Sequence, residues 1–200
     1  MLLTAQQIDS LVEVINIAFG RAAASLSDLT GHRVLLNVPK VSVAPLYELQ
    51  NVLNGAISSD VASVHQIFTG AVAGSALLLL DYEGAVALSG LLNDSRVPTG
   101  RLDASDREVL TEVGNILLNA CLGTFGNLLR VHISFSVPRL QIEALNGLLQ
   151  SLTIESEELK YALVVLTNFQ LRDSAIGGYL VIVLGVSSLD LLLAEIDKLG

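Results

Sequence analysis

The sequence predicts an α+β fold, a pseudo-two-fold duplicated domain with a mostly antiparallel β-sheet and two long helices on one face. Three observations lead to this prediction. A long segment with helical periodicity opens each half of the chain, each is followed by apolar segments typical of strands and hairpins, and a short motif recurs 99 residues later. Strands from both halves are expected to join one sheet.

The recurring motif is the strongest sign of duplication. Residues 13–17, EVINI, reappear as residues 112–116, EVGNI, and the Val-Pro pair at 38–39 reappears at 137–138. In both copies a Glu stands three residues before an Asn, and 22 residues separate that Asn from the Pro. We therefore expect a single domain spanning residues 1–200 and made of two repeats, about 1–93 and 103–200.

The first half begins with a long helix. Thr4 and Gln7 resemble a capping box, so the helix should begin near Ala5, and it should end before Thr30. The apolar residues of this segment recur at helical spacing, while Asp9, Glu13 and Asn16 form a polar row beside them. The rest of this half predicts, in order, a strand with Pro39 at an edge or bulge, a short helix, a hairpin of two strands and a helix, over residues 32–43, 46–54, 61–69, 71–80 and 83–92.

The second half repeats this order after a linker at residues 93–100. Ser105 and Glu108 predict a second capping box and a helix of about 20 residues, whose polar row is Glu108, Glu112, Asn115 and Asn119. The remaining expected elements are a strand carrying Pro138, a short helix, a hairpin of two strands and a closing helix, over residues 131–142, 143–152, 160–171, 176–186 and 188–199.

Composition narrows the functional classes. The net charge of −9 and the lack of Lys/Arg runs argue against nucleic-acid binding. Cys121 is the only cysteine, which excludes a disulfide framework and a thiolate metal site. The start lacks the pattern of a signal peptide, and the apolar run at 175–186 is too short to span a bilayer, so it is interpreted as a buried strand. We expect a soluble cytoplasmic protein.

The Glu/Asn pairs indicate half of an active site. An Asn amide both donates and accepts hydrogen bonds, which suits it to holding a water molecule in line with an electrophile, as the glutamine of GTPases does. A Glu one turn away would be repelled by a bare phosphate, but it could bind a Lys or Arg of a partner that carries the phosphoryl group. No P-loop, Cys/His or Ser/His/Asp arrangement competes with this interpretation.

The spacing of these residues resembles the signature of the CheC/CheX/FliY family of phosphatases, [DS]-x3-E-x2-N-x22-P. Asp9, Glu13, Asn16 and Pro39 match it fully; Glu112, Asn115 and Pro138 match it in the second copy, where Glu108 replaces the expected Asp or Ser. Two motif copies in about 200 residues, without a C-terminal flagellar-switch extension, are most similar to the CheC branch. The resemblance covers essentially the whole chain.

The resemblance implies a substrate and a role for each site residue. The substrate would be the aspartyl phosphate of a phosphorylated CheY-type response regulator, and Mg²⁺ would belong to that partner, leaving this chain without a cofactor or metal of its own. Asn16 and Asn115 would orient the attacking water, while Glu13 and Glu112 would pair with the partner's Lys. CheD is a further partner that the family implies.

Alternatives remain at several residues. Glu13 and Asn16 could form the solvated edge of a helix, Asp9 could complement the helix dipole, and Glu108 is explained better by the cap than by catalysis. Asn119 is placed outside the shared mechanism because its counterpart is Gly20. The competing functions are an adaptor that binds CheD or phosphorylated CheY with little turnover, and a flagellar-switch component related to FliY.

Overall fold

A computed structural model describes residues 3–53, 57, 60–93, 100–154, 159–171 and 173–198, without the side chains of Pro39, Thr153, Ile154 and Leu159. The predicted α+β class is confirmed, with elements in the expected order. The helices are α1 (Ala5–Thr30), η1 (Leu46–Glu48), α2 (Leu49–Leu53), α3 (Tyr82–Leu92), α4 (Ala104–Leu129), α5 (Leu145–Ile154) and α6 (Val186–Ile196). The strands are β1 (Val34–Pro45), β2 (Asp60–Gly70), β3 (Gly74–Asp81), β4 (Ile133–Phe135), β5 (Arg139–Ala144), β6 (Leu159–Leu171) and β7 (Ser174–Gly185).

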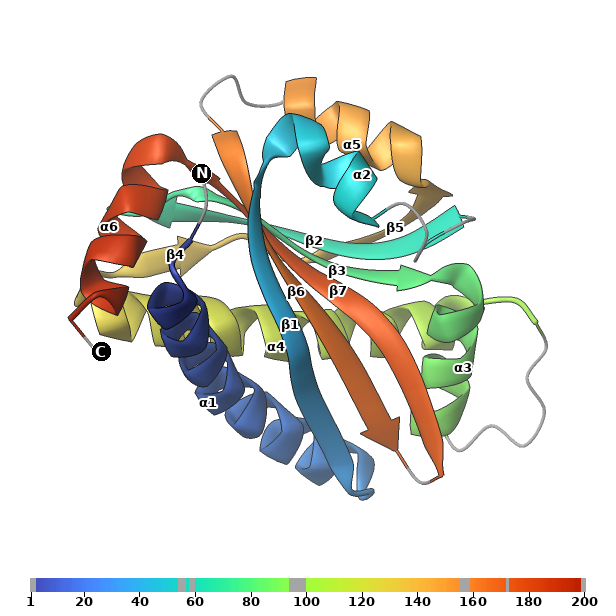
Figure 1. Cartoon of the computed structure of the whole chain (residues 1–200). Helices are drawn as coiled ribbons and strands as arrows, with labels where there is room; N and C mark the ends of the chain where they lie inside the picture. Colours follow the sequence, from blue (N-terminus) through green and yellow to red (C-terminus); the bar gives the residue numbers. More distant parts are fainter. Residues whose placement is uncertain are drawn as a thin grey trace.

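All seven strands join one antiparallel, strongly twisted sheet in the order β1-β6-β7-β3-β2-β4, with β5 also paired to β2 (Figure 1). The strand that follows each long helix pairs with a hairpin strand from the other half of the chain: β1 pairs with β6, and β4 and β5 pair with β2. The halves therefore interlock in one sheet. The internal duplication, and the division of the chain into two repeats, stay predictions from the sequence.

The two faces of the sheet carry different helices. Buried residues of α1, α3, α4 and α6 share one core cluster with the strand residues whose side chains point to that face of the sheet, such as Val64, Leu78 and Leu180. Residues of η1, α2 and α5 share a second cluster with Leu77, Val181 and their neighbours on the other face. Figure 1 shows α2 and α5 above the sheet and α1 and α4 below it. The two long helices thus lie on one face, as predicted, and pack against each other.

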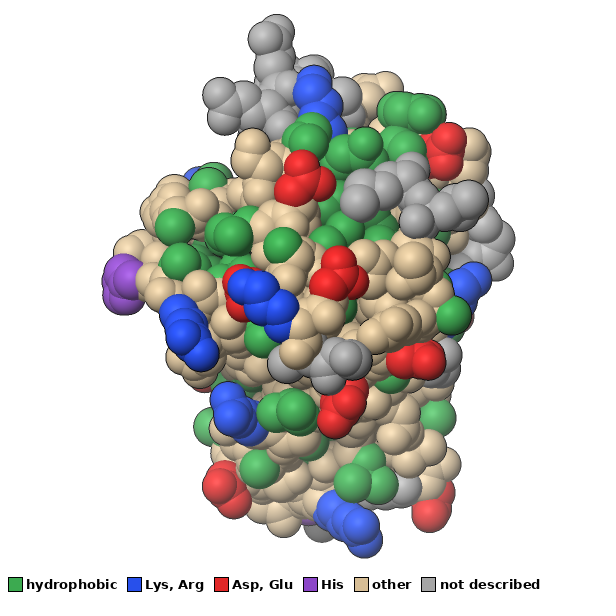
Figure 2. Space-filling view, turned by 60° about the vertical axis from the view of Figure 1, so that its left-hand side comes forward, with side chains coloured by type: hydrophobic (Ala, Val, Ile, Leu, Met, Phe, Trp, Pro, Cys, Tyr) green, Lys and Arg blue, Asp and Glu red, His purple; other side chains and the backbone are tan. Residues whose placement is uncertain are grey.

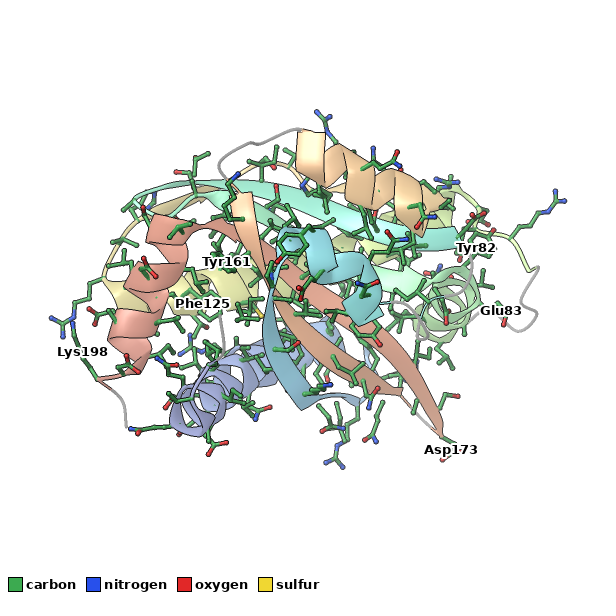
Figure 3. The ribbon with its side chains drawn as sticks, turned by 45° about the horizontal axis from the view of Figure 1, so that its top comes forward. Tyr82, Glu83, Phe125, Tyr161, Asp173 and Lys198 are labelled. Atoms are coloured by element: carbon green, nitrogen blue, oxygen red, sulfur yellow. The ribbon has the colours of Figure 1, made fainter. Side chains whose placement is uncertain are left out.

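The two long helices begin at capping boxes, one predicted and one not. Thr4 accepts a hydrogen bond from the Gln7 N–H and Gln7 reciprocates, which confirms the start of α1. The cap predicted at Ser105 is wrong: Asp103 is the N-cap of α4 and exchanges hydrogen bonds with Asp106. Tyr82 of α3 accepts a hydrogen bond from the Leu102 N–H at 3.3 Å and so holds the segment just before α4 (Figure 3).

The Pro-bearing strands are bulged in both halves. In β1, Val38 and Pro39 lie opposite the single residue Thr167, as expected for Pro39 at an edge strand or bulge. The single strand predicted over residues 131–142 is wrong, because it is divided into β4 and β5. The three residues at 136–138 lie opposite two residues of β2, and Pro138 has no N–H to donate to a ladder.

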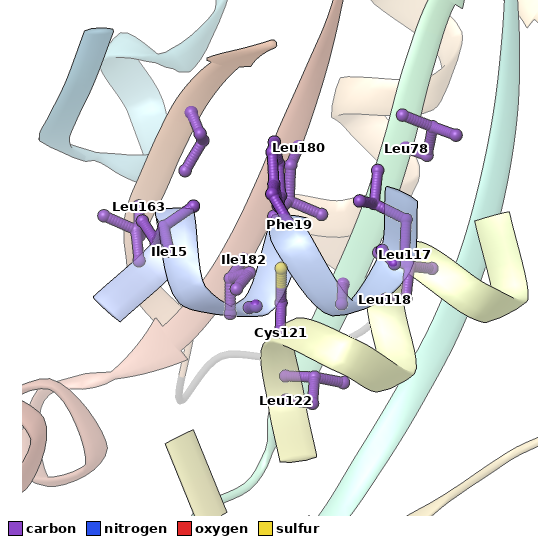
Figure 4. Packing of buried hydrophobic residues seen from close by; sticks show 14 of the residues in the cluster. Ile15, Phe19, Leu78, Leu117, Leu118, Cys121, Leu122, Leu163, Leu180 and Ile182 are labelled. Carbon is purple, nitrogen blue, oxygen red and sulfur yellow. The ribbon is translucent and has the colours of Figure 1, made fainter. Parts of the chain in front are cut away.

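The core around the two long helices is aliphatic and closely packed. Ile15 and Phe19 of α1 meet Leu117, Leu118 and the buried Cys121 of α4 above the sheet residues Leu78, Leu163, Leu180 and Ile182 (Figure 4). The apolar run predicted as a buried strand is confirmed as β7. Among the described helices, α4 alone is long and apolar enough to cross a membrane, but half of its most apolar window is buried inside the protein, as in a core helix.

Three expectations fall partly outside the described residues. The predicted linker at 93–100 covers residues 94–99, the predicted end of the short helix includes Gly55, and the closing helix was expected to reach residue 199.

Candidate active site

The first Glu/Asn pair lies on the outer side of α1. Val14, Ile15 and Ala18 of this helix are buried against the sheet and α4, so helical geometry turns the side chains of Glu13 and Asn16 to solvent. Within the part of the chain that the structure describes, neither polar side chain makes a hydrogen bond. Both are therefore available to a partner.

The second pair lies on α4 and differs in one respect. Glu112 is exposed and Asn115 half-buried, because Val113 and Gly114 between them face the core. The Asn115 Nδ2 donates to Glu112 Oε2 at 3.4 Å, and the Asn119 Nδ2 donates to Asn115 Oδ1 at 2.8 Å. The second pair is therefore the middle of a hydrogen-bonded row of three side chains, whereas the first pair is not.

The residues one turn before each Glu are also at the surface. Asp9 and Glu108 are both exposed. Because Asp103 caps α4, the cap does not account for Glu108 as predicted. Glu108 instead lines a shallow groove of about 350 Å³ beside the second pair, together with Arg107, Thr111, Glu112 and Leu140.

An apolar side chain follows each Asn, and its exposure differs between the sites. Ile17 is 49% exposed, whereas its counterpart Ile116 packs partly against the core. An exposed Ile beside a polar pair is a ready contact for a docking protein. The surroundings of the two pairs are therefore similar in chemistry but not identical.

The surface offers little to bind polyanions. Figure 2 shows a face on which Lys and Arg side chains stand singly among neutral and acidic ones. Lys198 at the end of α6 (Figure 3) forms an ion pair with Glu195. The net charge of −9 makes the average field of the chain unfavourable for a free phosphate.

The described residues contain no group of three or more His, Cys, Asp or Glu side chains that could hold a metal ion. Cys121 is 1% exposed, and burial raises the pKa of its thiol far above the ordinary value. A buried, protonated thiol is a poor nucleophile.

The contact of Asn119 with Asn115 is the feature that sequence reasoning missed. The residues stand four apart on one helix face, which is the spacing at which amide side chains meet. On sequence alone Asn119 falls outside the site because its counterpart in the first copy is Gly20, and only residues common to both copies are assigned to the shared mechanism. The spacing within α4 was the signal that could have found it.

Comparison with known proteins adds relatives to this geometry. No protein-family model matches the chain. CheC of Bacillus subtilis, a CheY-P phosphatase, is 25% identical over 167 residues, which cover 82% of this chain and 79% of CheC. The flagellar motor switch phosphatase FliY of the same organism is 22% identical over 70% of this chain, and the match spans only 36% of FliY.

Solved structures share the fold. A crystal structure of Thermotoga maritima FliY superposes with a TM-score of 0.80 at 21% identity and covers 99% of both chains. The FliM middle domain of H. pylori superposes with a TM-score of 0.65 at 11% identity, covering 96% of this chain and 99% of that domain.

Fold and site together define a class of α+β proteins in which one curled antiparallel sheet carries two long helices, each with a Glu/Asn pair at its surface. With the CheC and FliY relatives, these features support membership of the CheC/CheX/FliY family, the family that the motif resembles.

Proposed function

We propose that this chain is a chemotaxis phosphatase that hydrolyses the aspartyl phosphate of a CheY-type response regulator. The observation that carries the proposal is the placement of both Glu/Asn pairs at the surface of helices whose opposite sides are fixed in the core. The CheY-P phosphatase CheC among its relatives supports the same activity. A cytoplasmic location and CheD as a second partner are part of the proposal.

The chemistry follows from the two side chains. Glu13 or Glu112 pairs with a Lys of the response regulator and so fixes the helix against the partner's site. Asn16 or Asn115 then enters that site, where its amide accepts a hydrogen bond from the attacking water and holds it in line with the phosphorus. The partner's own Mg²⁺ neutralises charge on the phosphoryl oxygens. Excluding bulk water and fixing this geometry is the whole contribution of the chain.

The alternative is an adaptor that binds CheD or phosphorylated CheY with little turnover. The fold is compatible with it, since the FliM middle domain has the same architecture and forms a complex with FliG in H. pylori. The Glu/Asn pairs favour catalysis, because a scaffold has no need to display two water-positioning amides on one face.

The test uses a phosphorylated CheY-type receiver and measures the release of inorganic phosphate. Asn16→Ala with Asn115→Ala should reduce the rate to that of the receiver alone, while each single variant keeps part of the activity. Asn127→Ala is the matched control, since Asn127 is an exposed Asn on α4 about three helical turns beyond Asn115. Undiminished hydrolysis by the double variant would refute the mechanism. Phosphorylation-dependent binding by the wild-type chain with no change in phosphate half-life would favour the adaptor.

A further inference from the structure

The hydrogen-bonded row on α4 has no equivalent on α1. Asn115 accepts from Asn119 and donates to Glu112, whereas Gly20 occupies the position of Asn119 in the first copy and carries no side chain. Asn16 is therefore free to rotate about its side-chain bonds while the amide of Asn115 is held from both ends. The two sites differ in preorganisation rather than in their reacting groups.

The hydrogen bonds to Asn119 and Glu112 leave the Asn115 amide able to bind a water molecule. A carboxamide oxygen has two lone pairs and the amide nitrogen two N–H groups. The contact with Asn119 uses one lone pair, and the contact with Glu112 uses one N–H. One acceptor and one donor remain, which is what a water-positioning amide requires.

Asn119 also carries a cost to the fold. Its Oδ1 is buried and has no hydrogen-bond partner. An unsatisfied buried acceptor destabilises a protein by roughly 1–3 kcal/mol, and Asn is a poorer helix former than Leu or Ala. Stability alone gives no reason for an Asn at this position, so its hydrogen bond to Asn115 is the gain that offsets the cost.

We propose that Asn119 is a positioning residue that fixes the amide of Asn115, so that the second site turns over faster than the first. The inference rests on the proposed phosphatase function. A fixed amide raises kcat because less order has to be imposed when the water is aligned. It leaves KM nearly unchanged, because Asn119 itself does not reach the partner.

The first experiment isolates the second site in an Asn16→Ala background and replaces Asn119 with Leu, which is similar in size, and separately with Ala. We expect kcat for phosphate release to fall roughly five- to tenfold with KM within about twofold. The thermal midpoint should stay the same or rise in the Leu variant. A drop in stability that parallels the drop in activity, or an effect on KM alone, would overturn the inference.

The second experiment builds the missing residue into the first site. A Cβ at Gly20 would meet nothing within 4 Å, so Gly20→Asn fits without rearrangement. In an Asn115→Ala background, Gly20→Asn should raise kcat several-fold, while Gly20→Ala raises helix propensity at least as much without adding the amide and should leave kcat unchanged. Equal rates for the two variants would contradict the inference.

A third readout does not depend on activity. Side-chain amide relaxation by NMR should show Asn115 more ordered than Asn16, and Asn119→Leu should remove the difference. If Asn16→Ala with Asn115→Ala still hydrolyses the phosphate, both the proposed function and this inference fail. If that double variant is inactive and the Asn119 variants match their parent, the inference alone fails.

Discussion

Gly114 lies directly against Val64, and a Cβ added at Gly114 would fall well inside van der Waals distance of the Val64 side chain. In the first copy the same position is Ile15, whose side chain fills the space between α1 and the sheet. The glycine between Glu112 and Asn115 therefore lets the backbone of α4 lie close to β2. It sets how far the second pair stands from the sheet.

Gly114→Ala should push α4 away from β2 and lower the free energy of unfolding by about 1–3 kcal/mol, the usual cost of overpacking. Chemical denaturation measures the change. In an Asn16→Ala background the same variant should also slow phosphate release, because it moves Glu112 and Asn115.

Two further variants test whether a clash with Val64 causes the expected loss of stability. Gly114→Ala with Val64→Ala removes the two Val64 methyl groups from the clash and leaves only the contact with the Val64 Cβ, so the double variant should be more stable than the sum of the single effects allows. Gly123→Ala on the same helix meets nothing within 4 Å and should stabilise the protein by about 0.5–1 kcal/mol. Additive effects at Gly114 and Val64 would contradict the proposed contact.

The N-cap of α4 gives a second prediction. Asp103→Ala removes the side chain that accepts from the Asp106 N–H, and should cost about 1 kcal/mol of stability. Ser105→Ala, at the cap position expected from the sequence, should change stability by no more than about 0.5 kcal/mol. Thermal denaturation compares the two, and a larger loss for Ser105→Ala would restore the original assignment.

The failed cap shows what limits prediction here. Asp103 and Ser105 are both good N-cap residues, and each is followed three residues later by an acidic side chain. Tertiary contacts favour Asp103: the Asn93 Nδ2 donates to Asp106 Oδ1 at 3.2 Å, and the neighbouring Leu102 is 8% exposed. Those contacts join α3 to α4 and leave no mark on local sequence. At α1 only Thr4 competes, and the prediction is confirmed.

The strands and the site show the same contrast between features set by local sequence and features set by tertiary contacts. The fold class and the two helices that carry the Glu/Asn pairs could be predicted, because helical periodicity and a repeated motif are local signals. The division at Pro138 could not, because it depends on which strand pairs there: Ser136 exchanges hydrogen bonds with Ile67 of β2, far away in sequence. The catalytic roles of Glu13, Asn16, Glu112 and Asn115 remain predictions, although the structure places all four on the two long helices.

Cys121 gives a prediction about pH. Burial raises the pKa of its thiol, so the folded state keeps the proton while the unfolded chain loses it near the ordinary value of about 8.5. The contribution of this residue to stability is therefore complete below about pH 8.5 and falls as the pH rises above that value. The free energy of unfolding should decline more between pH 8 and 10 in the wild type than in Cys121→Ala.

The same thiol reports unfolding directly. As the only cysteine of the chain, Cys121 should react with a thiol reagent at pH 8 only as fast as the protein opens. Its labelling rate should rise in parallel with the unfolded fraction as denaturant is added. Rapid labelling of the native protein would show that α4 is not held in the core as described.

The two exposed glutamates give the last prediction, which tests the docking half of the proposed mechanism. Glu13→Gln with Glu112→Gln keeps the size and hydrogen bonding of both side chains but removes their charge, so the pairing with a cationic partner residue is lost. We expect KM for the phosphorylated receiver to rise roughly tenfold, the rise to shrink at high salt, and the free energy of unfolding to stay within about 0.5 kcal/mol. Glu48→Gln makes the same change at an exposed residue of η1, on the face away from the long helices, and should leave KM unchanged. An equal rise in KM for Glu48→Gln would mean that overall charge rather than docking at the two helices governs the encounter.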